Sequence, residues 1–262
     1  MSNEADVMVH EDSGVLRLSL NRPASRNGLL PETCEVMAER LETAAQRTDI
    51  RCIVLGSSDT SFCSGADLSG AALAVGTRSH DDLIRDCFHR LIRAVLNAPQ
   101  PVLASIRGPA VGFGFDLALA CDLRIAAKNS KLGSVFARIG LVPDGGSSFT
   151  LSRLVGLARA KELVFLAETF DGERAADLGV VNKVVADVDL DASTSEWAQR
   201  LCAGPPIALR HAKRNFNVGA GGTVDEALER EVAAQVDCLS SADLMEGVQA
   251  FFQKRPPQFK GK

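Results

Sequence analysis

Short apolar runs alternate with longer amphipathic stretches through the first two thirds of the chain. The short runs are rich in β-branched residues, which favours strands, and the longer stretches repeat their apolar residues at helical spacing. The pattern predicts strands at residues 15–20, 52–55, 102–106, 123–126 and 180–185, and helices at 31–46 and 83–97. Because strands and helices alternate, an α/β fold is indicated.

The strand pattern fades after about Ala192. Helices are predicted at 195–202, 206–217 and 224–252, with glycines and prolines between them. We therefore expect an α/β core at residues 1–191 and a helical region at 192–262. Residues 224–252 are too apolar for a tail exposed to water, so this region is expected to bind other copies of the chain.

Composition narrows the class of protein. The 262 residues are 46% apolar and 24% charged, close to the average for globular proteins, which excludes a disordered or fibrous chain. A net charge of −4 offers no general attraction to nucleic acid or an anionic membrane. No apolar stretch is long enough to span a bilayer. The seven cysteines form no CxxC pair, and no export signal precedes them, so we expect reduced thiols and a cytoplasmic location.

Several kinds of chemistry are disfavoured by spacing. The four histidines lie far apart and match no metal-binding motif, so no metal is expected. Gly112-Phe113-Gly114 starts like a dinucleotide-binding fingerprint, but Leu117 stands where the third glycine is needed. Ser64 is not in the sequence context of a nucleophilic serine and is expected to shape a turn.

Two glycine-bearing turns are more informative. Residues 62–68 read F-C-S-G-A-D-L after a predicted strand, and residues 108–122 read G-P-A-V-G-F-G-F-D-L-A-L-A-C-D after another. In the second turn, Gly112 and Gly114 permit close approach of the backbone, and a predicted helix begins there with free N–H groups. Such a place suits an oxyanion. The alternative is that both are only tight connections.

These turns belong to a series of motifs that resembles the crotonase superfamily of enoyl-CoA hydratases and isomerases. The series covers nearly the full chain in the family's order: L-N-R-P-x-x-R-N at 20–27, F-C-S-G-A-D-L at 62–68, G-P-A-V-G-F-G-F-D-L-A-L-A-C-D-L-R-I-A at 108–126, I-G-L-V-P-D-G-G at 139–146, R-L-V-G-L-A-R-A at 153–160, L-G-V-V-N-K-V-V at 178–185 and K-R-P-P-Q-F at 254–259. The resemblance implies a spiral of ββα units, a C-terminal helical trimerisation region, and usually a hexamer built from two trimers.

The resemblance also implies an oxyanion hole for the oxygen of an acyl-CoA thioester. Its two backbone N–H donors would be those of Ala66, which follows Gly65, and of Phe113, which follows Gly112. An amide donates whatever its side chain, so Phe113 can serve where many relatives have glycine. Coenzyme A would enter as part of the substrate, and no separate cofactor is expected.

The carboxylates depart from the hydratase pattern. Asp116 stands at the position of one hydratase glutamate, and Phe136 replaces the other. By the same resemblance, the position of Asp144 looks like the one occupied by the catalytic acid residue in some 3-enoyl/2-enoyl-CoA isomerases, in the phenylacetate-pathway isomerase and in the chlorobenzoyl-CoA dehalogenases. We therefore expect isomerisation of a 3-enoyl-CoA to a 2-enoyl-CoA with Asp144 as proton shuttle. Three alternatives stay open: a 2-enoyl-CoA hydratase that uses Asp116 and Asp144, a catalytically silent acyl-CoA binder, and an Asp144 that only caps a helix starting near Ser147.

The resemblance further implies where coenzyme A is bound. Its adenine end would lie against a loop made of the following residues: Ser25, Arg26, Ser64, Gly65, Ala66, Asp67 and Leu68. Arg26 and Lys254 are candidates for its phosphates, and Phe251 and Phe252 for covering the ligand of a neighbouring subunit. The alternatives are a solvated basic terminus for Lys254 and a place in the trimer interface for the two phenylalanines.

Overall fold

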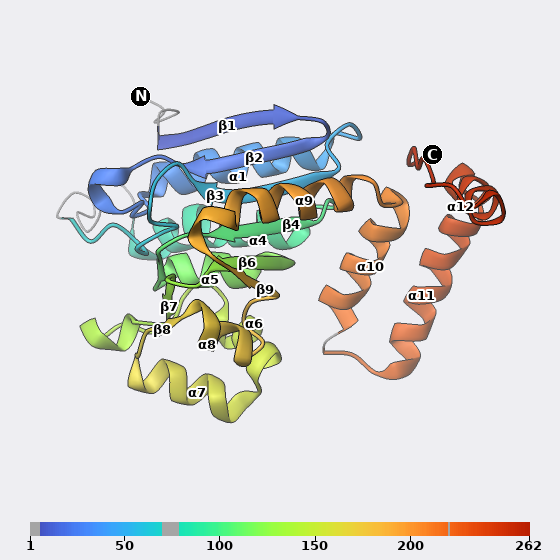
Figure 1. The fold of residues 1–262 in the computed structure, drawn as a ribbon. Helices are drawn as coiled ribbons and strands as arrows, with labels where there is room; N and C mark the ends of the chain where they lie inside the picture. Colours follow the sequence, from blue (N-terminus) through green and yellow to red (C-terminus); the bar gives the residue numbers. More distant parts are fainter. Residues whose placement is uncertain (1–5, 70–78, 220) are drawn as a thin grey trace.

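The structure is a computed structural model that describes residues 6–69, 79–219 and 221–262 (Figure 1). Within these residues the largest sheet has the strand order β1-β2-β3-β4-β6-β9. The first pair, β1 (Val7–Asp12) and β2 (Val15–Leu20), is antiparallel. The other neighbours pair in parallel and comprise β3 (Cys52–Ser57), β4 (Val102–Ile106), β6 (Leu123–Ala127) and β9 (Lys183–Val185).

Helices cover both faces of this sheet, which explains why β3 and β4 read as continuous apolar runs. The helices α1 (Pro31–Ala45), α4 (His89–Asn97) and α5 (Phe113–Ala120) bury the larger core cluster. On the opposite face α9 (Leu190–Cys202) contacts β2, β3, β4 and β6 over a smaller cluster (Figure 1). The helix α9 spans residue 192, where the helical region was expected to begin, and it packs on the sheet.

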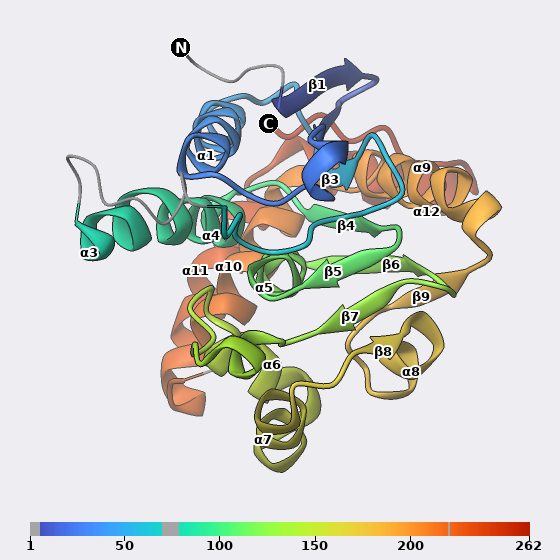
Figure 2. The same cartoon turned by 90° about the vertical axis from the view of Figure 1, so that its left-hand side faces the viewer.

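A second, three-stranded sheet lies beside the first (Figure 2). It consists of β5 (Pro109–Val111), β7 (Lys131–Gly133) and β8 (Phe170–Asp171). The helices α6 (Ser147–Val155), α7 (Leu157–Leu166) and α8 (Gly172–Asp177) accompany it. The chain order β1-β2-α1, β4-β5-α5 and β6-β7-α6 repeats a ββα unit, as the resemblance implies.

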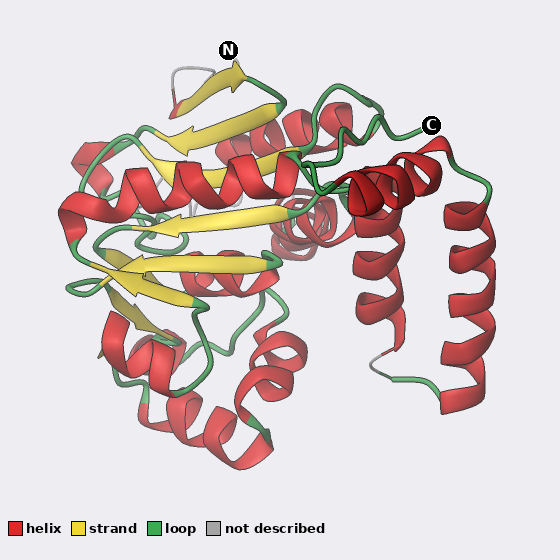
Figure 3. Ribbon diagram, turned by 45° about the vertical axis from the view of Figure 1, so that its right-hand side comes forward, coloured by secondary structure: helices red, strands yellow, loops and turns green. Residues whose placement is uncertain are grey.

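The C-terminal helices stand apart from the sheets (Figure 3). They are α10 (Pro206–Gly219), α11 (Val224–Leu239) and α12 (Ala242–Gln253). The prediction of a single helix at 224–252 is wrong. The first helix ends at Leu239, and α12 begins after Ser241, whose side chain caps it by accepting a hydrogen bond from Leu244 N–H.

One buried lysine ties α10 to the core. The Lys213 ammonium lies 2.8 Å from an Asp122 carboxylate oxygen and donates to the main-chain oxygens of Val95 and Gln100 at 3.1 Å. Asp122 in turn accepts the N–H of Val102 at 2.7 Å. The helical region is thus joined to the start of β4 through charge-assisted hydrogen bonds.

The helix predicted at 83–97 is built from three parts. These are α3 (His80–Leu83), a π-helical turn η3 (Ile84–Phe88) and α4. The strands β1, β5, β7 and β8 and the helices α7 and α8 were not predicted, and α6 was expected only in one alternative, as a helix near Ser147 capped by Asp144. The three-residue or shorter strands are too brief for a periodic signal, and β1 is an edge strand with one buried residue.

All seven cysteines lie in the described part of the chain, and each is a free thiol. Five of them are buried: Cys34, Cys52, Cys63, Cys87 and Cys121. Among the residues described, no helix combines the length and the apolar character that crossing a membrane requires.

Candidate active site

The two predicted glycine-bearing turns lie side by side. Cys63 N–H donates to Pro109 O at 2.9 Å, and Val111 N–H donates to Cys63 O at 3.0 Å. These bonds form an isolated parallel bridge between Cys63 and Ala110, so the turn after β3 runs along β5. Two segments that lie about 50 residues apart in the sequence are thereby paired side by side.

Glycine is required where the two segments meet. A Cβ at Gly114 would lie 2.5 Å from Cys63 O and 2.6 Å from Cys63 Cβ. Gly65 has φ +100° and Gly112 has φ +56°, which L side chains rarely adopt. A Cβ built at Gly65 would lie 3.5 Å from Phe113 N, so the two proposed oxyanion donors belong to neighbouring stretches of backbone.

Neither Ala66 N–H nor Phe113 N–H donates a hydrogen bond to another described residue. Phe113 is the first residue of α5, where N–H groups have no partner within the helix. Its ring is 1% exposed and packs edge-on against Phe88, with the ring centroids 5.0 Å apart. The side chain is therefore accommodated in the core while the N–H stays available. That the two N–H groups converge on one thioester oxygen remains a prediction.

The loop of Ser25 and Arg26 lies along the first turn. Ser64 N–H donates to Arg26 O at 3.1 Å, and Ser64 Oγ donates to Ser25 O at 2.9 Å. Gly65 O accepts Leu29 N–H at 2.8 Å. The structure thus brings together the residues predicted for the adenine end of coenzyme A, and their contact with it stays a prediction.

Two residues that hold this loop were missed as site residues, although both lie in the L-N-R-P-x-x-R-N motif. The Arg22 guanidinium bridges Asp6 at 3.2 Å and Asp67 at 3.0 Å. Asn27 is fully buried at φ +57°, and its side chain donates to Ser61 O and accepts the N–H of Arg22 at 2.7 Å. Since Arg22 and Asn27 bond within the protein, their role is to shape the loop.

Asp116 is fully buried on α5. Its Oδ2 accepts the N–H of Gly145 at 2.8 Å. Burial raises the pKa of Asp116 to about 7, and the nearby Asp144 carboxylate adds to this, while the hydrogen bond from Gly145 and the nearby Ser147 hydroxyl oppose it. A Cβ at Gly145 would lie 2.5 Å from Asp116 Cβ, so this contact also requires glycine.

Asp144 is half-buried next to Asp116. Burial raises the pKa of its carboxyl, and the neighbouring His89 opposes the rise. The main-chain oxygen of Asp144 lies 2.8 Å from Nε2 of His89. A carbonyl oxygen only accepts, so Nε2 of His89 carries the proton. The helix α6 begins at Ser147 with Gly146 as its N-cap residue, and no side chain of the described residues caps it, so Asp144 does not cap that helix.

The remaining predicted residues are divided between the core and the far end of the molecule. Phe136 is 8% exposed and belongs to the main core cluster. Phe251 and Phe252 on α12 are 79% and 78% exposed, and Lys254 follows them. Figure 1 shows α12 far from α5, so within the described part of one chain Phe251 and Lys254 do not lie with the other site residues.

Comparisons with known proteins show which family the chain is similar to. The family model "Enoyl-CoA hydratase/isomerase" matches residues 10–262. A probable enoyl-CoA hydratase of Rhodobacter capsulatus is 38% identical over 250 residues, 95% of each chain. The 1,2-epoxyphenylacetyl-CoA isomerase of Escherichia coli is 34% identical over 259 residues, 98% of each chain. A crystal structure of enoyl-CoA hydratase from Bacillus anthracis has a TM-score of 0.92 and 31% identity, and the match covers 98% of this chain and 100% of that one.

The chain therefore belongs to the enoyl-CoA hydratase/isomerase family, and the crotonase superfamily and fold predicted from its motifs are confirmed. It is an enzyme of this family that acts on an acyl-CoA thioester.

Replacing Gly114 with alanine should separate the two joined turns. The added Cβ meets the backbone of Cys63, which cannot move without disturbing the bridge to Ala110. Since one oxyanion donor is worth roughly 10²–10³ in kcat, we expect Gly114→Ala to lower turnover of an enoyl-CoA at least about 100-fold. The matched control is Gly221→Ala, where a Cβ meets no atom of the described residues within 4 Å and turnover should be unchanged. Equal rates for both variants would contradict this role of Gly114.

The raised pKa of Asp116 predicts a pH-dependent cost in stability. The unfolded chain releases this proton near pH 3.8, but the folded protein keeps it until about pH 7, so the free energy of unfolding should fall across that window. Asp116→Asn carries no such proton, and its stability relative to wild type should rise by on the order of 3 kcal/mol between pH 4 and pH 8.

Urea unfolding followed by the fluorescence of Trp197, the one tryptophan, measures this difference. Asp177→Asn at an exposed position is the matched control and should follow wild type at every pH. Parallel curves for wild type and Asp116→Asn would mean that Asp116 is ionised in the folded protein throughout.

Proposed function

We propose that this enzyme isomerises a 3-enoyl-CoA to a 2-enoyl-CoA, with the Asp144 carboxylate as proton shuttle. The carboxylate removes a proton from C-2, and the resulting dienolate places its negative charge on the thioester oxygen. The N–H groups of Ala66 and Phe113 stabilise that oxygen. Asp144 then returns the proton to C-4, which moves the double bond to C-2 and C-3 and restores the carboxylate.

The observation that carries this proposal is the unequal exposure of the two carboxylates. Asp116 is fully buried, and its Oδ2 is occupied by Gly145 N–H. Asp144 is half-buried, and its Oδ1, although buried, has no hydrogen-bond partner among the described residues, so of the two aspartates it is the one that keeps surface for a bound substrate. A single accessible carboxylate suits a proton that leaves one carbon and returns to another, whereas water addition by two groups needs both at the substrate.

The surroundings of Asp144 support the same reaction. Burial raises its pKa, which brings the carboxyl closer to a value suited to both taking and returning a proton. Phe136, at the position of a hydratase glutamate, is an apolar residue of the core and cannot activate water. The Escherichia coli relative is named an isomerase.

The runner-up is a 2-enoyl-CoA hydratase that uses both aspartates, and the name of the Rhodobacter capsulatus relative favours it. The raised pKa of Asp116 supports this reading, because a protonated carboxyl there can serve as an acid. A silent acyl-CoA binder would have neither activity. The two reactions differ in their products, so direct assays separate all three readings.

Asp144→Asn should remove most turnover of a 3-enoyl-CoA, on the order of 100-fold or more, since an amide cannot accept the proton. Acyl-CoA binding should stay nearly unchanged because the amide keeps the shape. The measurement is a side-by-side assay of 3-enoyl-CoA isomerisation and 2-enoyl-CoA hydration, with Asp177→Asn as matched control. If wild type hydrates far faster than it isomerises, the hydratase displaces this proposal; if Asp144→Asn keeps full rates, Asp144 is not the shuttle.

We further propose that the enzyme works as a trimer, with trimers paired into hexamers. One face of α11 exposes apolar side chains at helical spacing: Val224, Leu228, Val232, Val236 and Leu239, each more than half exposed. Phe251 and Phe252 on α12 are also strongly exposed, at 79% and 78%. A neighbouring subunit would cover these residues, and Phe251 and Lys254 would then have a route to a site that their own chain does not offer.

Light scattering at micromolar concentration tests the assembly. Wild type should have the mass of three or six chains, and Val232→Glu with Val236→Glu should shift it toward one chain, because buried charge without a partner disfavours the interface. A wild-type protein that stays monomeric would rule the assembly out.

A further inference from the structure

The π-helical turn η3 stands directly before His89. Its defining hydrogen bond runs from His89 N–H to Ile84 O, five residues back. A π-helical turn contains one residue more than an α-helical turn, and each residue of an α-helix advances by about 100° around the axis. The extra residue therefore rotates the side chains of α4 by about 100° around the axis relative to those of α3. Such insertions are frequent at functional sites.

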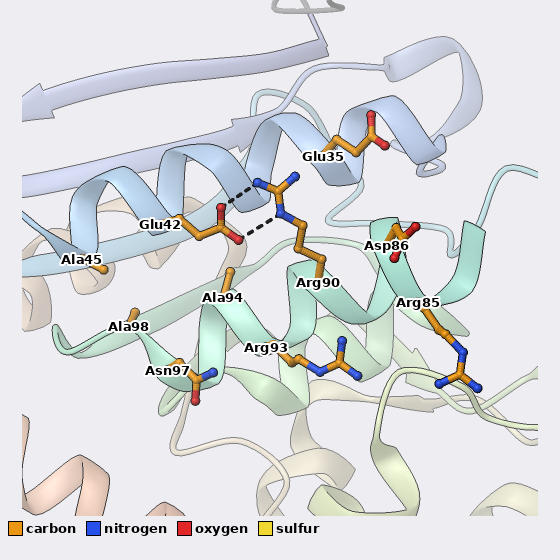
Figure 4. Close-up of a pocket in the computed structure, with 10 residues that line it drawn as sticks. All are labelled: Glu35, Glu42, Ala45, Arg85, Asp86, Arg90, Arg93, Ala94, Asn97 and Ala98. Carbon is orange, nitrogen blue, oxygen red and sulfur yellow. Dashed lines mark hydrogen bonds and ion pairs between the residues drawn. The ribbon is translucent and has the colours of Figure 1, made fainter. Parts of the chain in front are cut away.

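Four consecutive residues at this junction have defined partners. Two of them reach α1: Cys87 Sγ lies 3.3 Å from Glu35 Oε1, and Arg90 binds Glu42 through two hydrogen bonds of 2.6 and 3.0 Å. Figure 4 shows Arg90 reaching from α4 across to Glu42 on α1. The other two residues reach the site, since Phe88 packs on Phe113 and His89 binds Asp144 O. The junction is therefore fixed to α1 on one side, and on the other side it contacts both the start of α5 at Phe113 and the loop of Asp144.

His89 and Asp116 hold the two ends of one peptide group. His89 Nε2 lies 2.8 Å from the carbonyl oxygen of Asp144, and Asp116 Oδ2 accepts the N–H of Gly145 at 2.8 Å. That carbonyl and that N–H belong to the same planar unit. Because a plane fixed at both ends cannot rotate, the backbone of Asp144 is oriented from two different helices, α4 and α5.

We propose that His89 is a positioning residue for the Asp144 carboxylate, which it orients by clamping the Asp144–Gly145 peptide against Asp116. This rests on the proposed role of Asp144 as the proton shuttle. The Asp144 side chain starts from the backbone that the clamp fixes, so the clamp sets where the carboxylate meets the substrate. Since a misplacement of about 1 Å can cost 100-fold in rate, losing one end of the clamp should slow the chemical step more than binding.

The test compares two replacements of His89. His89→Met keeps the bulk and removes the donor, and we expect kcat to fall at least about tenfold while KM changes less than about threefold. His89→Gln keeps an N–H donor at similar reach and should restore most of kcat. His80→Met makes the same change at an exposed position on α3 and should leave both constants unchanged. Thermal unfolding and binding of a non-reactive acyl-CoA verify that each variant is folded.

Rates are measured for both isomerisation and hydration, beside Asp144→Asn. Unchanged kcat in His89→Met, with Asp144→Asn slow, overturns the role of His89 and leaves the proposed function intact. Equal losses in His89→Met and His89→Gln also overturn it, because donation would then not matter. A raised KM with an unchanged kcat in His89→Met assigns His89 to substrate binding and overturns its positioning role. A fast Asp144→Asn rejects the shuttle itself, and with it this inference.

Discussion

Two main-chain hydrogen bonds, from Cys63 to Pro109 and from Val111 to Cys63, join the turn after β3 to the strand before α5. The rest of the candidate site depends on this pairing. It places Gly65 against Phe113 and brings the start of α5 under the turn. From α5, Asp116 then reaches the Gly145 N–H, which fixes the loop that carries Asp144. Backbone pairing thus sets the geometry before any side chain acts.

The site also depends on positions that have no side chain. At Gly114 and Gly145 an added Cβ would lie 2.5 Å from its nearest neighbour. One glycine lets two turns approach each other, and the other lets a loop approach a buried carboxyl. The polar residues around them, Asp116 and His89, bind the loop through its backbone. Chemistry on the substrate is left to few groups, which are held in place by many contacts within the protein.

The sequence predicted what depends on local pattern. The periodic runs predicted β2, α1, β4 and α10 because each is long enough to repeat its apolar spacing. Motif resemblance predicted the family, and it singled out Asp144. The sequence did not reveal His89, because its partner lies 55 residues away and no local feature marks the contact. The buried state of Asp116 and the break between α11 and α12 likewise follow from packing and capping that a linear pattern does not contain.

The reactivity of a buried thiol can report when the segment around it opens. Thiols react as thiolates, and burial raises the pKa of Cys63 to about 12, so this sulfur is doubly protected in the closed state. Cys63 lies in the turn that precedes Ala66, and its Sγ accepts the Gly65 N–H at 3.4 Å. Alkylation of this one residue therefore requires the two joined turns to part. The rate at which Cys63 is alkylated would then measure how often these two turns separate. This opening is distinct from the unfolding of the C-terminal helices.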